Sequence, residues 1–183
     1  NFEKNKKGKV YVSVPVASER SCYVNLAQGS LVAWKTYKRG SYKPIAPVDA
    51  GRARMVRIGS YGDPAAVPAH VWRELVSESK GWTGYTHQPA FEDELQDLCM
   101  VSADSLSQAQ AAWGSGKRTF RIVGSVDEIA KDEILCPASK EAGYRSTCID
   151  CKLCNGTSAK TNKSVAIVVH GPGAKHHNII AKG

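Results

Sequence analysis

Residues 55–64 read MVRIGSYGDP, a short apolar run followed by a turn rich in Gly, Ser, Asp and Pro. Apolar and β-branched residues bounded by turn residues are typical of a strand, so we expect a strand over 55–59 and a turn over 60–64. Residues 67–79 follow with apolar side chains at helical spacing, and Pro68 is well placed for a first helical turn. This stretch therefore predicts a strand, a turn and a helix in succession.

The same order of elements continues toward the C-terminus. We expect strands over 82–86, 98–102, 119–123, 133–136 and 164–169, a charged turn over 92–97, and an Ala- and Gln-rich helix over 105–113. Strands that alternate with helices or short loops favour a mainly parallel sheet. About six such units are too few for a closed eight-stranded barrel. The predicted fold class is therefore α/β, either a partial, open TIM-like barrel or a mainly parallel sheet.

The N-terminal residues 1–53 have a different character from the α/β core expected over 54–183, although we expect a single domain overall. Residues 9–16 alternate and predict a strand. Residues 22–27 predict a short helix or strand, which Gly29 is expected to end.

A basic and aromatic segment follows. Trp34 and Tyr37 lie among the basic residues Lys35, Lys38, Arg39 and Lys43. Such a mixture is suited to stacking on bases and holding phosphates. The alternative, which we favour, is that Trp34 anchors an amphipathic segment to the core.

The chain has 183 residues, a formal net charge of +8 and a pI near 9.2. This length is sufficient for one domain with its own core. The positive charge favours polyanionic partners, nucleic acid first, and a host protein is a second candidate partner. No apolar run reaches the length of a membrane span and no signal-peptide pattern is present, so we expect a cytoplasmic protein with no membrane partner.

Four of the six cysteines fall within residues 136–154. The segment opens with Cys136-Pro137 and closes with Cys148-x2-Cys151-x2-Cys154. Three evenly spaced cysteines with a remote Cys-Pro are typical of the ligands of a [4Fe-4S] cluster. Tetrahedral Zn²⁺ bound by the four thiolates is the alternative. Disulfides are less expected, because nothing in the chain indicates secretion. We therefore predict a metal-binding loop over 136–154.

Polar residues recur at the expected carboxyl ends of the strands, where parallel α/β sheets place their chemistry. Asp63, His87 and Asp104 are the candidate catalytic residues at this edge. The alternatives are structural: Asp63 and Asp104 as helix caps, and His87 as a hydrogen-bonded histidine. His170 follows the last strand. It is a candidate to replace Cys136 as the fourth metal ligand, or to form a hydrogen bond to one of the ligands without binding the metal itself.

These motifs occur in an order that resembles a known family. The segments are RIGSYGD at 57–63, GYTH at 84–87, SAD at 102–104, and the Cys-Pro followed by the spaced cysteines. Over about residues 54–171 they resemble the gene product 88-like family of phage- and plasmid-borne proteins. Members of that family look like incomplete relatives of the radical-SAM barrel. The resemblance implies a strand-end aspartate, a tyrosine-containing second strand and a terminal cysteine loop, and it implies no known reaction.

The chain departs from true radical-SAM enzymes at one point. Those enzymes carry C-x3-C-x2-C after the first strand, whereas the N-terminal third of this chain contains only Cys22. Cleavage of adenosylmethionine is therefore not expected.

Three functional hypotheses follow from the sequence. The first is a metal-centre protein of mobile-element type, with a [4Fe-4S] cluster, that acts on or near nucleic acid. The second is a zinc-stapled binding module that interacts with a host protein or nucleic acid without catalysis. The third is a hydrolase or transferase that uses Asp63 and His87 without a metal.

Overall fold

The computed structural model describes residues 2–4, 10–12 and 29–171. In the N-terminal part, β1 (Phe2–Lys4) pairs with β2 (Val10–Val12) as an antiparallel ribbon. The strand expected over 9–16 therefore agrees with β2 where the chain is described. The element expected over 22–27 lies outside the described residues.

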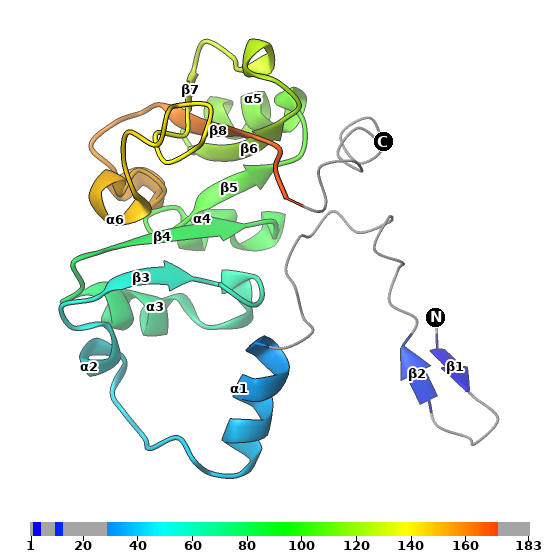
Figure 1. Ribbon diagram of the computed structural model, residues 1–183, viewed down its shortest axis with the longest axis vertical. Helices are drawn as coiled ribbons and strands as arrows, with labels where there is room; N and C mark the ends of the chain where they lie inside the picture. Colours follow the sequence, from blue (N-terminus) through cyan, green and yellow to red (C-terminus); the bar gives the residue numbers. More distant parts are fainter. Residues whose placement is uncertain (1, 5–9, 13–28, 172–183) are drawn as a thin grey trace.

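The core is one six-stranded sheet in the order β3-β4-β5-β6-β8-β7, and every neighbouring pair of its strands is parallel (Figure 1). Its strands are β3 (Met55–Ile58), β4 (Gly81–Thr86), β5 (Met100–Ala103), β6 (Thr119–Val123), β7 (Glu133–Leu135) and β8 (Ser164–Val168). The predicted α/β class and the parallel sheet are confirmed. The sheet is open, with β3 and β7 at its edges.

Six helices and four 3₁₀ turns connect these strands or precede them in the described residues. The helices are α1 (Gly29–Lys38), α2 (Pro47–Gly51), α3 (Ala69–Val76), α4 (Glu92–Leu95), α5 (Leu106–Gly114) and α6 (Cys148–Cys151). The 3₁₀ turns are η2 (Pro64–Ala66), η3 (Pro89–Phe91), η4 (Val126–Glu128) and η5 (Gly156–Ser158). The predicted helices over 67–79 and 105–113 are confirmed as α3 and α5, whereas α4 forms where a turn was expected.

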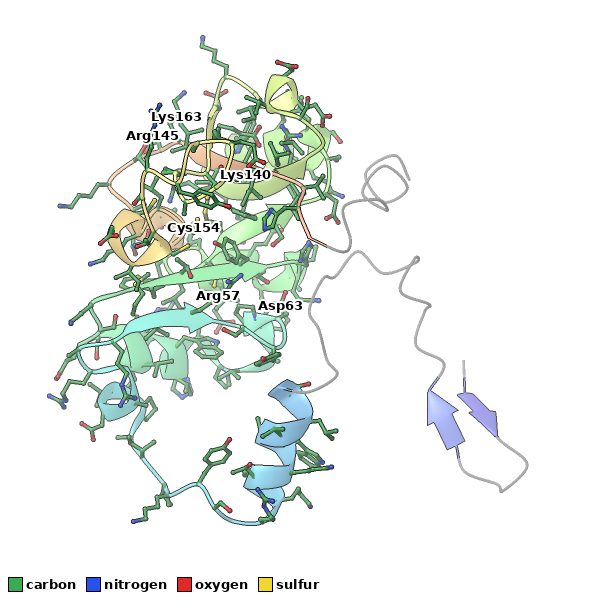
Figure 2. The ribbon with its side chains drawn as sticks, in the orientation of Figure 1. Arg57, Asp63, Lys140, Arg145, Cys154 and Lys163 are labelled. Carbon is green, nitrogen blue, oxygen red and sulfur yellow. The ribbon has the colours of Figure 1, made fainter. Side chains whose placement is uncertain are left out.

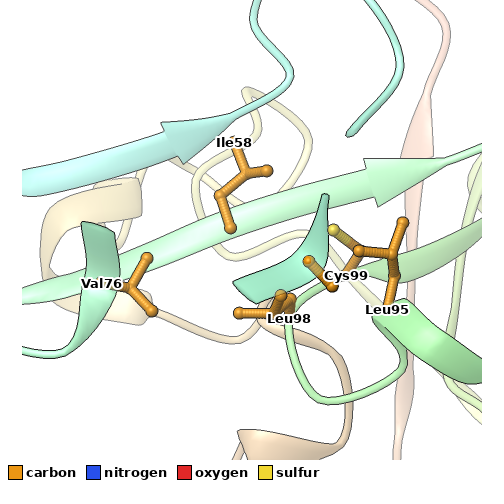
Figure 3. Close-up of a cluster of buried hydrophobic side chains, with 6 residues drawn as sticks. Ile58, Val76, Leu95, Leu98 and Cys99 are labelled. Carbon is orange, nitrogen blue, oxygen red and sulfur yellow. The ribbon is translucent and has the colours of Figure 1, made fainter. Parts of the chain in front are cut away.

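One face of the sheet is covered by α3, α4 and α5. Ile58 of β3 packs with Val76 of α3 and Leu95 of α4, and with Leu98 and Cys99, which precede β5 (Figure 3). Farther along the same face, the Trp113 indole of α5 donates to the Thr119 and Ser164 hydroxyls.

 The apolar cluster of Ile58, Ala69, Val76, Leu95, Leu98 and Cys99 joins α3 and α4 to the β3 end of the sheet.

A buried ion pair lies farther along this face. Arg121 of β6 donates through Nε to Glu133 of β7 at 2.8 Å, and its Nη2 also bonds the Glu128 carbonyl oxygen at 2.7 Å. Glu133 accepts a further hydrogen bond from the Ala130 amide. The pair reaches across β8 and fixes the edge strand β7 to the body of the sheet.

The strand order reverses at the end of the sheet, and this reversal places the cysteine segment. From β3 to β6 each strand adds beside the previous one, and α3, α4 and α5 cross on one face. β7 then lies one position beyond β8, so the connection over 136–163 runs back in the opposite direction. A right-handed crossover in that direction must pass over the opposite face. The cysteine connection accordingly covers the face that the helices leave free.

Gly29 begins α1, and the element that it was expected to end lies outside the described residues. One N-terminal expectation is wrong. Trp34 is not a core anchor, since its side chain is 54% exposed and α1 has no buried residue.

Candidate functional site

The cysteine connection is shaped by a short helix and a left-handed turn. Thr147 caps α6, because its hydroxyl oxygen accepts from the Asp150 amide, and the same hydroxyl donates to the Asp150 carboxylate at 2.6 Å. Lys152 then adopts a left-handed conformation with φ 52°, which ends the helix. This turn directs Leu153 and Cys154 back toward the sheet, where both pack against its core.

Cys154 is the most enclosed of the four loop cysteines. It packs with Met100 and Val165, and its carbonyl oxygen accepts a hydrogen bond from the Gly84 amide at 2.8 Å. Burial raises the pKa of the Cys154 thiol to about 12, although a hydrogen bond from the Tyr85 hydroxyl acts in the opposite direction. Figure 2 labels Cys154 beneath the connection.

The other three thiols lie close enough to Cys154 to act on it electrostatically. Cys136, Cys151 and Cys148 each raise the pKa of Cys154, and Cys148 and Cys151 also raise that of Cys136, for which burial is the larger cause. All four are free thiols. The predicted set is thus gathered on one face of the sheet, from the end of β7 and from the α6 turn.

The sulfur atoms of the four loop cysteines do not form a metal coordination sphere in the described structure. Within residues 29–171 and the two short strands, no group of three or more His, Cys, Asp or Glu side chains is arranged to hold a metal ion. Four neighbouring thiols fit a four-thiolate centre by their donor chemistry.

A buried arginine holds this connection in place. Arg118, directly before β6, is only 5% exposed. Its Nη1 donates to the carbonyl oxygens of Leu153 and Gly156 at 2.8 and 2.7 Å, and its Nε and Nη2 both donate to that of Lys163. Burial lowers the pKa of Arg118, whereas the neighbouring Cys154 raises it.

Arg118 has no carboxylate partner among the described residues. Its hydrogen bonds all go to neutral carbonyl oxygens, in contrast to Arg121, which pairs with Glu133. A buried cation without a counter-charge is costly. The positive charge of Arg118 therefore favours negative charge at the adjacent thiols.

Two further polar groups border the thiols. Tyr85 packs against Phe120 at 4.6 Å between ring centroids, and the Arg57 guanidinium lies 5.8 Å from the centre of the Tyr85 ring. Burial, followed by the proximity of Cys154, raises the pKa of Tyr85 well above its usual value, so Tyr85 remains a hydrogen-bond donor. Next to Cys154, the Asn155 Oδ1 atom is buried without a hydrogen-bond partner in the described structure.

A second group of candidate residues lies at the carboxyl edge of the sheet. Asp63 accepts hydrogen bonds from the Ala65 amide, the Thr86 hydroxyl and the His87 amide at 3.0, 2.7 and 2.7 Å. Both carboxylate oxygens are therefore engaged in caps and cross-links. These contacts support the structural interpretation of Asp63, because they tie the turn after β3 to the end of β4.

His87 and Asp104 contact each other at the same edge. The His87 Nε2 atom lies 3.4 Å from the Asp104 Oδ1 atom, and both side chains are about half exposed. This hydrogen bond raises the pKa of His87 and lowers that of Asp104. Ser105, not Asp104, caps α5, since its hydroxyl oxygen accepts from the Gln108 amide. The capping role considered for Asp104 is therefore wrong.

His170 lies beyond β8, and its Nδ1 atom is 3.0 Å from the Val168 carbonyl oxygen. This contact is local to the end of β8 and does not link His170 to the cysteine segment. The structure thus brings the four cysteines together on one face and Asp63, His87 and Asp104 along one edge.

Tyr85, Arg118 and Asn155 were missed as site residues by the sequence interpretation. Tyr85 lies within the GYTH motif, so its place in a strand that faces the cysteine segment was the available signal. Arg118 and Asn155 carry no pattern of their own, and only the crossover over the second face brings Arg118 to the loop.

Comparisons with protein-family models, with curated proteins and with solved structures found no match to this chain. No helix among the described residues combines the length and the apolar character that crossing a bilayer requires.

Proposed function

We propose that this chain is a metal-centre protein in which Cys136, Cys148, Cys151 and Cys154 hold a [4Fe-4S] cluster, and that it acts on or near nucleic acid. The observation that carries the proposal is that four free thiols lie near Arg118, a buried cation with no carboxylate partner among the described residues. A cluster of this kind supplies one-electron redox chemistry when bound.

Charge balance supports an anionic centre at this position. Thiols bind metals as thiolates, and four thiolates around either a [4Fe-4S] core or Zn²⁺ leave a net negative charge. Arg118 is buried next to Cys154 and would supply the compensating positive charge. Tyr85 would donate its hydrogen bond to the Cys154 sulfur, which stabilises negative charge there.

The surroundings of the thiols are apolar on one side and open on the other. Met100 and Val165 are fully buried beneath Cys154, whereas Cys148 is exposed. Such a centre would be shielded from water by the sheet and reachable by a partner from the side of α6. This arrangement is compatible with electron exchange at the protein surface.

The nucleic-acid part of the proposal rests on the net charge of +8, which favours a polyanionic partner. The resemblance to the gene product 88-like family supports a mobile-element origin. Ligand thiols need a reducing compartment, so the cytoplasm is the location that we propose.

A zinc-stapled binding module is the second candidate, and one observation favours it. Ile149, the apolar residue beside Cys148, is 59% exposed and does not shield the thiols from water. Leu153 alone packs toward the sheet. A redox-inert Zn²⁺ ion would tolerate this open side, and metal binding would then stabilise the fold without catalysis.

The test is metal and sulfide analysis with a visible spectrum on full-length protein prepared without oxygen. The proposal expects iron and acid-labile sulfide, a brown colour and broad visible absorbance. Cys151→Ser should abolish the absorbance. Cys99→Ser is the matched control, because Cys99 is equally a free thiol but lies in the cluster under the helices.

Each result has a definite meaning. A colourless protein with bound zinc would replace the redox proposal with the zinc module. Failure to bind either metal, with all thiols freely reactive in the native protein, would overturn both candidates. Circular dichroism of the Cys151→Ser variant separates loss of a ligand from loss of the fold.

A further inference from the structure

We infer that α1 and the residues after it, 29–46, form a binding surface for single-stranded nucleic acid. This inference rests on the nucleic-acid part of the proposed function and assigns it to a surface remote from the cysteines. Figure 1 shows α1 at the end of the molecule beyond α2, away from the cysteine connection.

The first observation is the exposure of large side chains that have no core role. α1 has no buried residue, and Trp34 and Tyr37 are 54% and 65% exposed. Further along, Tyr42 and Ile45 are also more than half exposed. Exposed aromatic rings gathered in one segment mark an interaction surface more often than scattered single residues do.

The second observation is a concentration of unpaired positive charge. Residues 29–48 contain no Asp or Glu, and their cations are Lys35, Lys38, Arg39 and Lys43. None of these four forms an ion pair with another described residue, whereas Arg52, Arg73 and Lys117 each pair with a carboxylate. These four cations of α1 and the residues after it are therefore available to an external anion.

The third observation is that the cations and the rings are interleaved. The Trp34 and Tyr37 ring centroids lie 6.2 Å apart with the planes tilted by 31°. Lys38 places its ammonium 5.3 Å from the centre of the Trp34 ring. A phosphate bound by Lys38 would therefore lie next to the Trp34 ring, on which a base of the same strand could stack. Proteins that bind single strands combine these two contacts.

This interleaving distinguishes the surface from a membrane-binding helix. At 100° per residue, Lys35 and Lys38 fall on the same side of α1 as Leu31, within about 40° of it around the helix axis. The cations and the apolar side chains therefore share one face of α1. A helix that lies on a bilayer separates its cations from its apolar face. Duplex nucleic acid also fits poorly, because its bases are already stacked on one another.

The test is fluorescence anisotropy of a labelled oligothymidine with the full-length, metal-loaded protein. Trp34→Ala and Tyr37→Ala are each expected to weaken binding by about tenfold. Phe91→Ala is the matched control, because Phe91 is an exposed aromatic residue outside this segment. Lys38→Ala should reduce the slope of log affinity against log salt by about 0.7, as expected for one lost phosphate contact.

Four results would overturn the inference. They are no loss of affinity on Trp34→Ala, an equal loss on Phe91→Ala, preferential binding to anionic lipid vesicles, and duplex DNA bound as tightly as oligothymidine. The metal assay separates this inference from the proposed metal centre. A protein that binds iron but not oligothymidine retains its centre and loses this surface, whereas the reverse result retains the surface alone.

Discussion

The Arg118 Nη1 atom donates to the Leu153 carbonyl oxygen at 2.8 Å, so a buried residue directly before β6 holds the peptide that precedes Cys154. The same nitrogen bonds the Gly156 carbonyl two residues beyond that cysteine. Arg118 therefore fixes both sides of Cys154, and through Lys163 it also fixes the end of the connection.

Arg118→Met is expected to reduce the free energy of unfolding by about 3 kcal/mol, because it leaves three buried or partly buried carbonyl oxygens without their donor. Urea denaturation followed by circular dichroism measures this change. Arg73→Met is the control: Arg73 pairs with Asp97 at the surface, and its loss should cost about 1 kcal/mol or less. Equal effects of the two substitutions would contradict the role assigned to Arg118.

Gly156→Ala is expected to destabilise the cysteine connection. Gly156 has φ +61°, and a Cβ atom there would collide with the Gln96 carbonyl oxygen. Backbone strain and this collision together should cost about 3 kcal/mol. Gly114→Ala, where the added Cβ meets open space at the end of α5, should be neutral or slightly stabilising in the same denaturation assay.

Glu133→Gln is expected to cost about 3–5 kcal/mol, because it leaves the buried Arg121 guanidinium without its counter-charge. Thermal and urea unfolding both report this loss. The neighbouring Asp132→Asn variant removes an exposed carboxylate that lies 3.8 Å from Lys163, so its cost should stay below about 1 kcal/mol. A small effect of Glu133→Gln would show that the pair contributes little to holding β7.

The His87–Asp104 pair predicts a pH dependence. The hydrogen bond to Asp104 raises the pKa of His87, so its stabilisation is present below the unfolded pKa and is lost as pH rises through the folded value. The pKa of Asp104 is lowered, so its stabilisation is lost as pH falls through the folded value. Both groups are half exposed, and the contribution should be about 0.2–1 kcal/mol.

Nuclear magnetic resonance titration of the His87 ring measures this coupling. Asp104→Asn should lower the pKa of His87 toward that of an isolated histidine. Asp63→Asn is the comparison, since Asp63 bonds the backbone of His87 and not its ring. A larger shift with Asp63→Asn would contradict the assignment of Asp104 as the main cause.

Tyr85→Phe is expected to leave the fold in place, with a loss of about 1 kcal/mol, because the ring still packs against Phe120. If the iron–sulfur proposal holds, the variant should bind the cluster at a lower reduction potential, because a hydrogen bond to a ligand sulfur favours the reduced form. Tyr144→Phe, at an exposed position of the same connection, is the control. Protein-film voltammetry compares the two variants.

Much of the sheet could be predicted from local patterns. The strand over 119–123 agrees with β6 at both ends, and the others differ from the structure by one or two residues. Apolar runs bounded by Gly, Pro and Asp carry this information within a few residues. The order of the strands is a long-range property, and no local pattern indicates that β8 lies between β6 and β7.

The candidate site was predicted in part for the same reason. The spacing of Cys148, Cys151 and Cys154 is local and visible in the sequence, whereas the contact of this segment with Tyr85 and Arg118 depends on the reversed crossover. The exposure of Trp34 could not be predicted either, because an aromatic residue at helical spacing is more often buried. Arg121 and Glu133 were the available signal of a buried pair, since opposite charges occurred inside two expected strands.

The position of β8 between β6 and β7 also bears on how the chain is made. A ribosome delivers β7 before β8, so a nascent chain that has not reached Ser164 holds two strands with no neighbour between them. Their unpaired edges are open to other chains during that interval. Completion of the sheet therefore depends on the late insertion of β8 between β6 and β7. This order of synthesis makes cotranslational aggregation a particular hazard for this topology.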